Sequence, residues 1–302
     1  MPERVVRAMS QSLIDHRGPA FALLLREIVA GLKQVFQTAA GHILLFPGSG
    51  TGAWESCIVN TLSPGDRVLG CANGYFSDQF CRIATAHGIE VQRLEVEYGF
   101  GVAAEMVEER LQRDRGHQIK AVLVLQTETS TGVTSNLGAV RKAMDTAGHP
   151  ALLLADVVSS LGCTTLRFDE WKLDVALAGS QKGLMLPPGM ALLAVSEKAL
   201  QANRSAKCAR AFWDWHSVLE SNANGHFPYT PATALLFGLR ESLNMLFEEG
   251  LKNVVSRHAR LAEACRRAVR GMTLKLFARN PAEYCNTLTA VSMPELTAKS
   301  KS

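Results

Sequence analysis

The 302-residue sequence contains no apolar run close to the roughly 20 residues that a membrane-spanning helix requires. Its first residues, Met1-Pro2-Glu3-Arg4, also lack the apolar core that a secretory signal peptide carries. These two absences predict a soluble, cytoplasmic protein with no membrane partner.

Neither positive charge nor cysteine is concentrated in one part of the chain. The net charge is +4 and the basic residues form no run, whereas a nucleic-acid-binding surface requires clustered basic side chains. The seven cysteines include no CxxC pair and lie mostly in apolar runs, where a free thiol packs as a small hydrophobic group. We therefore expect no nucleic-acid partner, no metal site and reduced, buried thiols.

The sequence does contain a regular alternation of short apolar runs and longer amphipathic stretches. Several runs are apolar on consecutive residues, as is typical of strands that helices cover on both faces. The alternation predicts βαβ crossovers and an α/β fold with a mostly parallel seven-stranded sheet sandwiched by helices. The predicted strands are 42–46, 68–72, 91–96, 121–127, 151–156, 175–180 and 191–196, and the predicted helices between them are 51–62, 78–87, 103–115 and 136–147.

The two flanks of this region have different patterns. We expect one amphipathic helix over 21–39 and, beyond Pro231, helices over 232–247 and 252–270 with a break at Gly250. Strand-like segments at 273–278 and 287–292 begin a further α/β unit, and we expect the polar end, 294–302, to be disordered. The sequence therefore predicts a large domain over 1–250, followed over 251–302 by a linking helix and the start of a small domain.

Reactive residues are expected where the apolar strands end, because open parallel sheets bind ligands at the carboxyl ends of their strands. The first strand leads into a glycine-rich turn with Ser49, Gly50 and Thr51, where free N–H groups at a helix start favour a phosphate. The fifth strand ends at Asp156, and the sixth leads to Lys182. A phosphate turn, a carboxylate and a lysine in this order are what pyridoxal phosphate requires.

Taken singly, each of these features has a plainer interpretation. The turn is also compatible with an ordinary glycine turn, Asp156 with a helix cap, and Lys182 with a solvated lysine. A nicotinamide-dependent oxidoreductase is a further alternative, but the turn reads GxGxG, whereas dinucleotide binding is typical of GxGxxG. The order of the three features favours pyridoxal phosphate.

Five motifs, spread over nearly the whole chain, resemble those of the class V, fold-type-I pyridoxal-phosphate aminotransferases. The resemblance is greatest to the serine–glyoxylate and alanine–glyoxylate group, and the Trp54 form of the glycine-rich turn favours the serine–glyoxylate branch. It implies a transaminase that moves an amino group from L-serine or L-alanine to glyoxylate through a Schiff base with the cofactor. The motifs are FPGSGTGAWE (46–55), TSTGV (129–133), DVVSSLG (156–162), GSQK (179–182) and FPYTPA (227–232).

The resemblance also implies roles for individual residues around the cofactor ring. Lys182 matches the lysine that forms the Schiff base and later moves the proton, and Asp156 matches the partner of the pyridine nitrogen. Phe76 matches an aromatic side chain that stacks on the ring, and Val158 matches a residue that packs on the opposite face. Thr129 matches a residue near the ring hydroxyl.

A second group of residues matches positions around the cofactor phosphate. Ser49, Gly50 and Thr51 match the phosphate turn, and Gln181 also lies near the phosphate in the family pattern. Thr230 matches a segment that reaches the phosphate of the neighbouring subunit. The resemblance therefore implies a homodimer whose active sites are shared between subunits.

Two parts of the family pattern have no counterpart in this sequence. They are a Pro-Gly-Pro segment ahead of Pro2 and, beyond the region of Glu295, a strand with an arginine that binds the substrate carboxylate. The resemblance thus implies a truncated small domain and leaves open a cofactor-binding but catalytically impaired fragment. A related class V lyase, such as a cysteine desulfurase, is the other alternative, which Gln181 and the lack of a glycine-rich cysteine loop disfavour.

Overall fold

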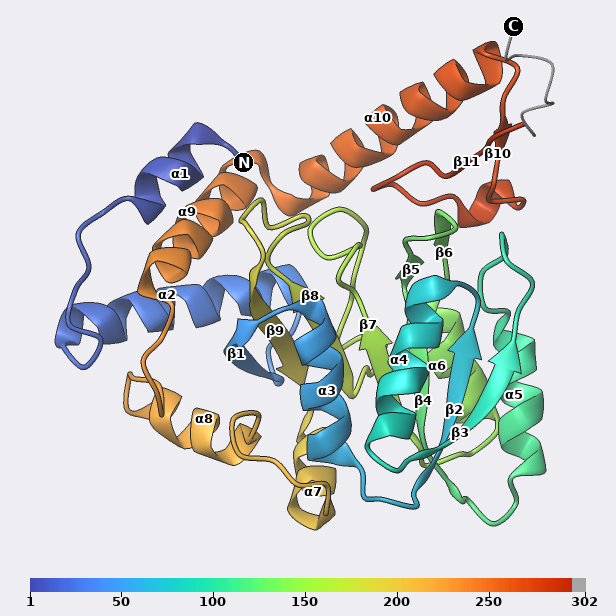
Figure 1. Ribbon diagram of the computed structural model, residues 1–302, viewed down its shortest axis with the longest axis horizontal. Coiled ribbons are helices and arrows are strands. Elements are labelled where there is room, and N and C mark those ends of the chain that lie inside the picture. The colour runs from blue at the N-terminus through green and yellow to red at the C-terminus, as the bar shows by residue number, and fades with distance from the viewer. Residues whose placement is uncertain (295–302) are drawn as a thin grey trace, which may run out of the picture.

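A seven-stranded sheet with helices on both faces forms the centre of the computed structural model, which describes residues 1–294 (Figure 1). The strand order is β1-β9-β8-β7-β4-β2-β3, and only β9 runs opposite to the other six described strands of this sheet. The predicted mostly parallel α/β sheet is therefore confirmed. Its strands are β1 (His42–Gly48), β2 (Arg67–Ala72), β3 (Glu90–Glu95), β4 (Ile119–Leu125), β7 (Leu152–Asp156), β8 (Val175–Gly179) and β9 (Gly189–Val195).

Apart from the edge strand β3, the strands are mostly apolar on both faces because each face packs against its own layer of helices. In β7, Leu152 and Leu154 belong to one hydrophobic core, whereas Leu153 and Ala155 belong to the other. The first core contains residues of α3 (Gly50–Thr61) and α4 (Tyr75–Ala86). The second contains residues of α2 (Pro19–Phe36), α5 (Ala104–Arg113) and α6 (Leu137–Thr146).

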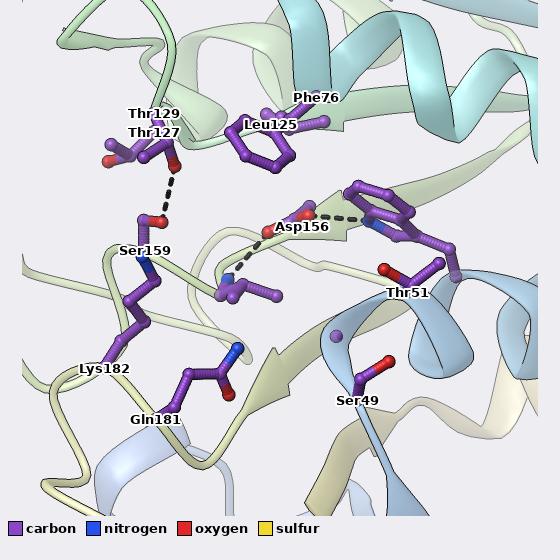
Figure 2. Close-up of a pocket in the computed structure, with 13 residues that line it drawn as sticks. Ser49, Thr51, Phe76, Leu125, Thr127, Thr129, Asp156, Ser159, Gln181 and Lys182 are labelled. Atoms are coloured by element: carbon purple, nitrogen blue, oxygen red, sulfur yellow. Dashed lines mark hydrogen bonds between the residues drawn. The ribbon is translucent and has the colours of Figure 1, made fainter. Parts of the chain in front are cut away.

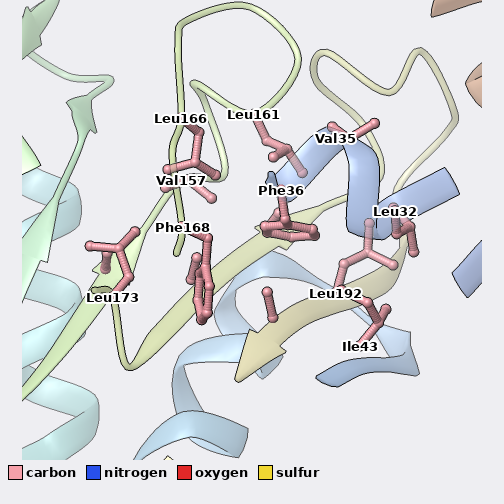
Figure 3. Close-up of a cluster of buried hydrophobic side chains, with 14 of the residues drawn as sticks. Leu32, Val35, Phe36, Ile43, Val157, Leu161, Leu166, Phe168, Leu173 and Leu192 are labelled. Carbon is pink, nitrogen blue, oxygen red and sulfur yellow. The ribbon is translucent and has the colours of Figure 1, made fainter. Parts of the chain in front are cut away.

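Residues 157–174 connect β7 to β8 through turns, and helix α2, which precedes the first strand, covers this part of the sheet in place of a crossover helix. Figure 3 shows the contact, in which Phe168 and Leu161 lie close to Phe36. The Phe168 N–H also donates to the Phe36 carbonyl oxygen at 3.2 Å. The helix predicted over 21–39 ends at Phe36 because Gln37 adopts a left-handed conformation, with a φ of 56°.

The C-terminal part of the described chain extends away from the sheet and returns to it. α9 (Thr233–Glu249) and α10 (Leu251–Gly271) meet at Gly250, where the break was predicted and φ is 82°. α10 projects outward in Figure 1, and the short strands β10 (Lys275–Leu276) and β11 (Val291–Ser292) then pair antiparallel. The expectation that the polar end is disordered concerns residues 294–302, and all but the first of these lie outside the described part of the chain.

Several short elements were not indicated by the sequence pattern. They are α1 (Glu3–Met9), α7 (Glu197–Ser205), α8 (Trp215–Ala223), a turn of 3-10 helix (Pro281–Glu283), and a ribbon of β5 (Thr127–Glu128) and β6 (Val133–Thr134). Within residues 1–294, no helix combines the length and the apolar character needed to cross a membrane.

Candidate active site

A cavity of about 240 Å³ lies at the edge of the sheet where β1, β4, β7 and β8 reach their carboxyl ends. The structure brings nine of the ten predicted site residues into its wall. Thr230 is exposed in the link between α8 and α9 and does not line the cavity. The wall consists of Ser49, Gly50, Thr51, Trp54, Phe76, Leu125, Thr127, Thr129, Asp156, Val158, Ser159, Gln181 and Lys182.

The glycine-rich turn presents the start of α3 to this cavity. Ser49 is the N-cap residue, and its Oγ accepts a hydrogen bond from the Gly52 N–H at 3.2 Å. A Cβ atom at Gly50 would lie 2.8 Å from Cγ2 of Val158, so glycine permits α3 to approach the segment after β7. The N–H groups of the first helical turn and the positive end of the helix dipole therefore favour an anion here.

Asp156, the last residue of β7, places a buried carboxyl group in the middle of the cavity wall. Its Oδ1 accepts from the Val158 N–H at 2.7 Å, and its Oδ2 accepts from Nε1 of Trp54 at 2.6 Å. Burial raises the pKa of Asp156 to about 7, against the two hydrogen bonds, which lower it. A cationic nitrogen of a ligand placed beside this carboxyl group would stabilise its charged form.

Lys182 and Gln181 follow β8 in the turn that leads to β9. Figure 2 shows Lys182 on one side of Asp156 and Thr51 on the other. Oε1 of Gln181 and Oγ1 of Thr127 are buried and have no hydrogen-bond partner among the described residues. Both side chains line the cavity, so both retain hydrogen-bonding capacity for a ligand.

Phe76 reaches the cavity from the first turn of α4, which begins at Tyr75, three residues earlier than the predicted start at 78. The reason is a cap from another part of the chain: the buried carboxylate of Glu128 accepts from the N–H groups of Phe76 at 3.4 Å and Ser77 at 2.9 Å. Glu128 also accepts from Oγ of Ser130 at 2.6 Å. These contacts fix the helix start that presents Phe76.

Four residues of the cavity wall were not predicted as site residues: Trp54, Leu125, Thr127 and Ser159. Trp54 lies four positions after Gly50 and therefore on the same face of α3, a spacing that the sequence does contain. Oγ of Ser159 is 2.7 Å from Oγ1 of Thr129, so the two hydroxyls form a pair across the cavity wall. Leu125 and Thr127 come where β4 ends.

The groups in the cavity fit pyridoxal phosphate. The α3 start provides donors for a phosphate, Asp156 provides a buried carboxyl group for a ring nitrogen, and Lys182 provides a primary amine. Among residues 1–294, no group of three or more His, Cys, Asp or Glu side chains could hold a metal ion.

Comparison with known proteins gives a result that agrees with the chemistry of this cavity. Residues 4–300 match the model of the family described as aminotransferase class-V. The chain is 50% identical over 300 residues to the serine–glyoxylate aminotransferase of Methylorubrum extorquens, covering 98% of this chain and 75% of that protein. It is 44% identical to the L-aspartate–glyoxylate aminotransferase of Paracoccus denitrificans, covering 98% and 74%. The crystal structure of an alanine–glyoxylate aminotransferase from Nostoc sp. superposes with a TM-score of 0.90 at 30% identity, covering 96% and 76%.

Proposed function

Because the chain belongs to the class V aminotransferases, which use pyridoxal phosphate, we propose that it transfers the amino group of L-serine, or of L-alanine, to glyoxylate. The observation that carries the proposal is the cavity, in which Lys182, Asp156 and the start of α3 meet. The choice of L-serine is supported by the 50% identity to a serine–glyoxylate aminotransferase, and that of glyoxylate by several glyoxylate-using relatives.

The proposed chemistry assigns the proton transfer to Lys182 and the electrostatic support to Asp156. When bound, pyridoxal phosphate supplies an aldehyde carbon that takes up the amino group and a ring that withdraws electrons. Nζ of Lys182 would hold that carbon until the amino acid displaces it, and would then take the proton from the substrate Cα. The carboxylate of Asp156 would face the ring nitrogen and keep it protonated.

The remaining residues would bind and orient the cofactor. The N–H groups at the start of α3, with the hydroxyls of Ser49 and Thr51, would bind the phosphate. Phe76 and Val158 would pack on the two faces of the ring. Thr129 and Gln181 line the same cavity. We propose that Thr129 lies near the ring hydroxyl and that Gln181 lies near the phosphate.

We also propose a homodimer whose active sites are shared between subunits. Thr230 does not line the cavity of its own chain, and its exposed position leaves it accessible to a second copy. In a two-fold dimer each subunit would place this residue at the other subunit's phosphate. The family resemblance of the FPYTPA segment (227–232) supports this arrangement.

The function is tested by following each half of the reaction in the purified protein. After loading with pyridoxal phosphate, L-serine, L-alanine and L-aspartate are added separately, and loss of the visible absorbance of the lysine-bound cofactor is recorded. We expect the highest kcat/KM for L-serine, and glycine as product when glyoxylate follows. Cofactor uptake without amino transfer from any donor would show an impaired binding protein, and a preference for L-aspartate would reassign the donor.

The role of Lys182 is tested by Lys182→Ala. We expect kcat/KM to fall by roughly a thousand-fold, since general acid–base catalysis typically contributes 10²- to 10⁴-fold. After borohydride reduction, mass spectrometry of the wild-type digest should find the cofactor on the peptide containing Lys182. Lys142→Ala, which changes an exposed lysine of α6 outside the cavity, is the control and should behave like the wild type. Cofactor on another lysine would contradict the assignment.

A further inference from the structure

We propose that Trp54 is a positioning residue, whose indole N–H fixes the Asp156 carboxylate in the orientation that meets the ring nitrogen of the cofactor. The inference rests on the proposed function, because it concerns how the chain prepares Asp156 for that nitrogen. Trp54 would act only through Asp156 and would not take part in the proton transfer.

The first argument is the geometry of the carboxylate. Its two oxygens accept from two different donors: Oδ2 from Nε1 of Trp54 at 2.6 Å, and Oδ1 from the Val158 N–H at 2.7 Å. A carboxylate held at one oxygen can still rotate about its Cβ–Cγ bond, whereas two donors fix the plane of the group. Loss of the Trp54 N–H would release one of its two oxygens.

The second argument is the fixed position of the indole ring itself. Trp54 is 5% exposed and lies stacked on Phe80 of α4, with ring centroids 5.5 Å apart and an angle of 15° between the rings. A ring packed in this way cannot turn its N–H away from the carboxylate without losing that contact. The packing of α3 against α4 therefore fixes the position of the Trp54 N–H in the protein without a ligand.

The third argument is electrostatic. Asp156 is 3% exposed, and burial alone favours its neutral form, which could not pair with a ring cation. Hydrogen bonds from Val158 and Trp54 and the charge of Lys182 lower its pKa, whereas the charge of Glu128 raises it. The Trp54 N–H thus favours the carboxylate form in a place where burial and Glu128 oppose it.

The test compares Trp54→Phe with Trp215→Phe. Phenylalanine at position 54 keeps a ring against Phe80 but removes the donor. The control removes a buried indole N–H that donates to Oγ of Ser56 at 2.9 Å and does not line the cavity. We expect the affinity for pyridoxal phosphate to fall about tenfold in Trp54→Phe, as for the loss of one hydrogen bond to a charged group. The control should stay within about twofold of the wild type.

A double-mutant cycle separates positioning from packing. If Trp54 acts through the carboxylate, Trp54→Phe should change cofactor affinity by less than about twofold when Asp156→Asn is already present. A loss of the same factor with and without Asp156→Asn would overturn the proposal, since the indole would then contribute only packing.

A second measurement uses the wild-type protein without cofactor and remains decisive if Trp54→Phe does not fold. The chain has four tryptophans, so indole ¹⁵N labelling gives four resonances, which single Trp→Phe variants at the other three positions can assign. We expect the Trp54 N–H resonance to shift with pH around a midpoint near 7, and Asp156→Asn to abolish the shift. A Trp54 resonance at the same chemical shift in the wild type and in Asp156→Asn at every pH would overturn the proposal, since the indole N–H would then not be bonded to the carboxylate. Failure of the wild type to bind pyridoxal phosphate would instead refute the proposed function, and the NMR result would still stand.

Discussion

The carboxyl group of Asp156 is buried, and its pKa is therefore higher than that of a carboxyl group in water. Burial raises its pKa from 3.8 to about 7, so the folded protein without cofactor holds a proton that the unfolded chain releases at lower pH. The folded state then binds more protons than the unfolded state between these two values. Linkage therefore requires the free energy of unfolding to fall as pH rises through this window.

Asp156→Asn tests this linkage in the cofactor-free protein. When the pH is raised from about 5 to about 8, we expect the free energy of unfolding of the wild type to fall by about 3 kcal/mol more than that of the variant. Urea denaturation at both pH values measures the difference. Equal pH dependence in the two proteins would show that Asp156 does not titrate in this window. Bound pyridoxal phosphate should remove this pH dependence, because a ring cation keeps the Asp156 carboxylate charged in the folded protein throughout the window.

At the residue scale, three predicted residues that the structure brings together in one cavity share one origin. Asp156 ends an apolar strand, Ser49 and Lys182 follow one, and parallel strands bring their carboxyl ends to one edge. The partners of these residues could not be found in the same way. Trp54 is 102 positions from Asp156, and Glu128 is 52 positions from Phe76, so both hydrogen bonds depend on tertiary packing.

At the scale of elements, the start of α4 depends on a side chain that the ribbon of β5 and β6 supplies. Glu128→Ala would leave the N–H groups of Phe76 and Ser77 without their acceptor, and Ser77 is buried. We expect a loss of about 2 kcal/mol in the free energy of unfolding, since an unsatisfied buried donor costs roughly 1 to 3 kcal/mol. Faster hydrogen exchange at Phe76 and Ser77, with weaker cofactor binding, should accompany the loss.

Two variants show whether this effect belongs to the cap of α4. Glu128→Gln keeps one carbonyl oxygen as an acceptor and should cost less than the alanine variant. Asn136→Ala removes the N-cap side chain of α6, which accepts from the Ala139 N–H at 3.0 Å, and should cost about 1 kcal/mol without changing cofactor affinity. Unchanged exchange at Phe76 in Glu128→Ala would contradict the capping role.

The elements themselves were predicted to different degrees. All seven strands of the sheet were predicted, and for most of them a continuous apolar run identifies a strand that is buried on both faces; the edge strand β3 is mostly polar. The start of α4 was placed too late, because its cap comes from Glu128 and not from the residues that precede it. α7 and α8 were missed, since each is short and buries only two residues.

At the scale of the whole molecule, the proposed sharing of active sites between subunits predicts how mixed dimers behave. Lys182→Ala and Thr230→Asp are each expected to inactivate a homodimer, the second by placing a negative charge beside the phosphate. If Thr230 serves the partner's site, random mixing should restore about one quarter of wild-type activity, because half of the dimers would contain one intact site. Activity is measured after the two variants are unfolded and refolded together. No recovery would show that Thr230 and Lys182 serve the same chain's site.

We propose that residue 250 separates a large domain, 1–250, from a linking helix and the start of a small domain, 251–302. The described part of the second unit contacts the first through Val254 of α10, which is buried in the hydrophobic core, and through several hydrogen bonds. The Cys285 N–H donates to the carbonyl oxygen of Gly132 at 3.1 Å, the Arg279 N–H donates to that of Gly99 at 2.9 Å, and the Gly101 N–H donates to the Glu283 carboxylate at 2.7 Å. These bonds hold residues 279–285 beside the β5–β6 ribbon and the segment before α5.

The reversed strand β9 has a consequence for the kind of molecule that can use this cavity. It lies between β1 and β8, so these two strands run in the same direction but are separated by one neighbour. With strands about 4.8 Å apart, the turn after β1 and the lysine after β8 are offset by about 10 Å across the sheet. The reversal of β9 therefore places the anion site of Ser49 to Thr51 and the backbone of Lys182 on either side of one strand. The long side chain of Lys182 must cover part of this distance to reach the reactive carbon of a compound whose anion is bound at Ser49 to Thr51.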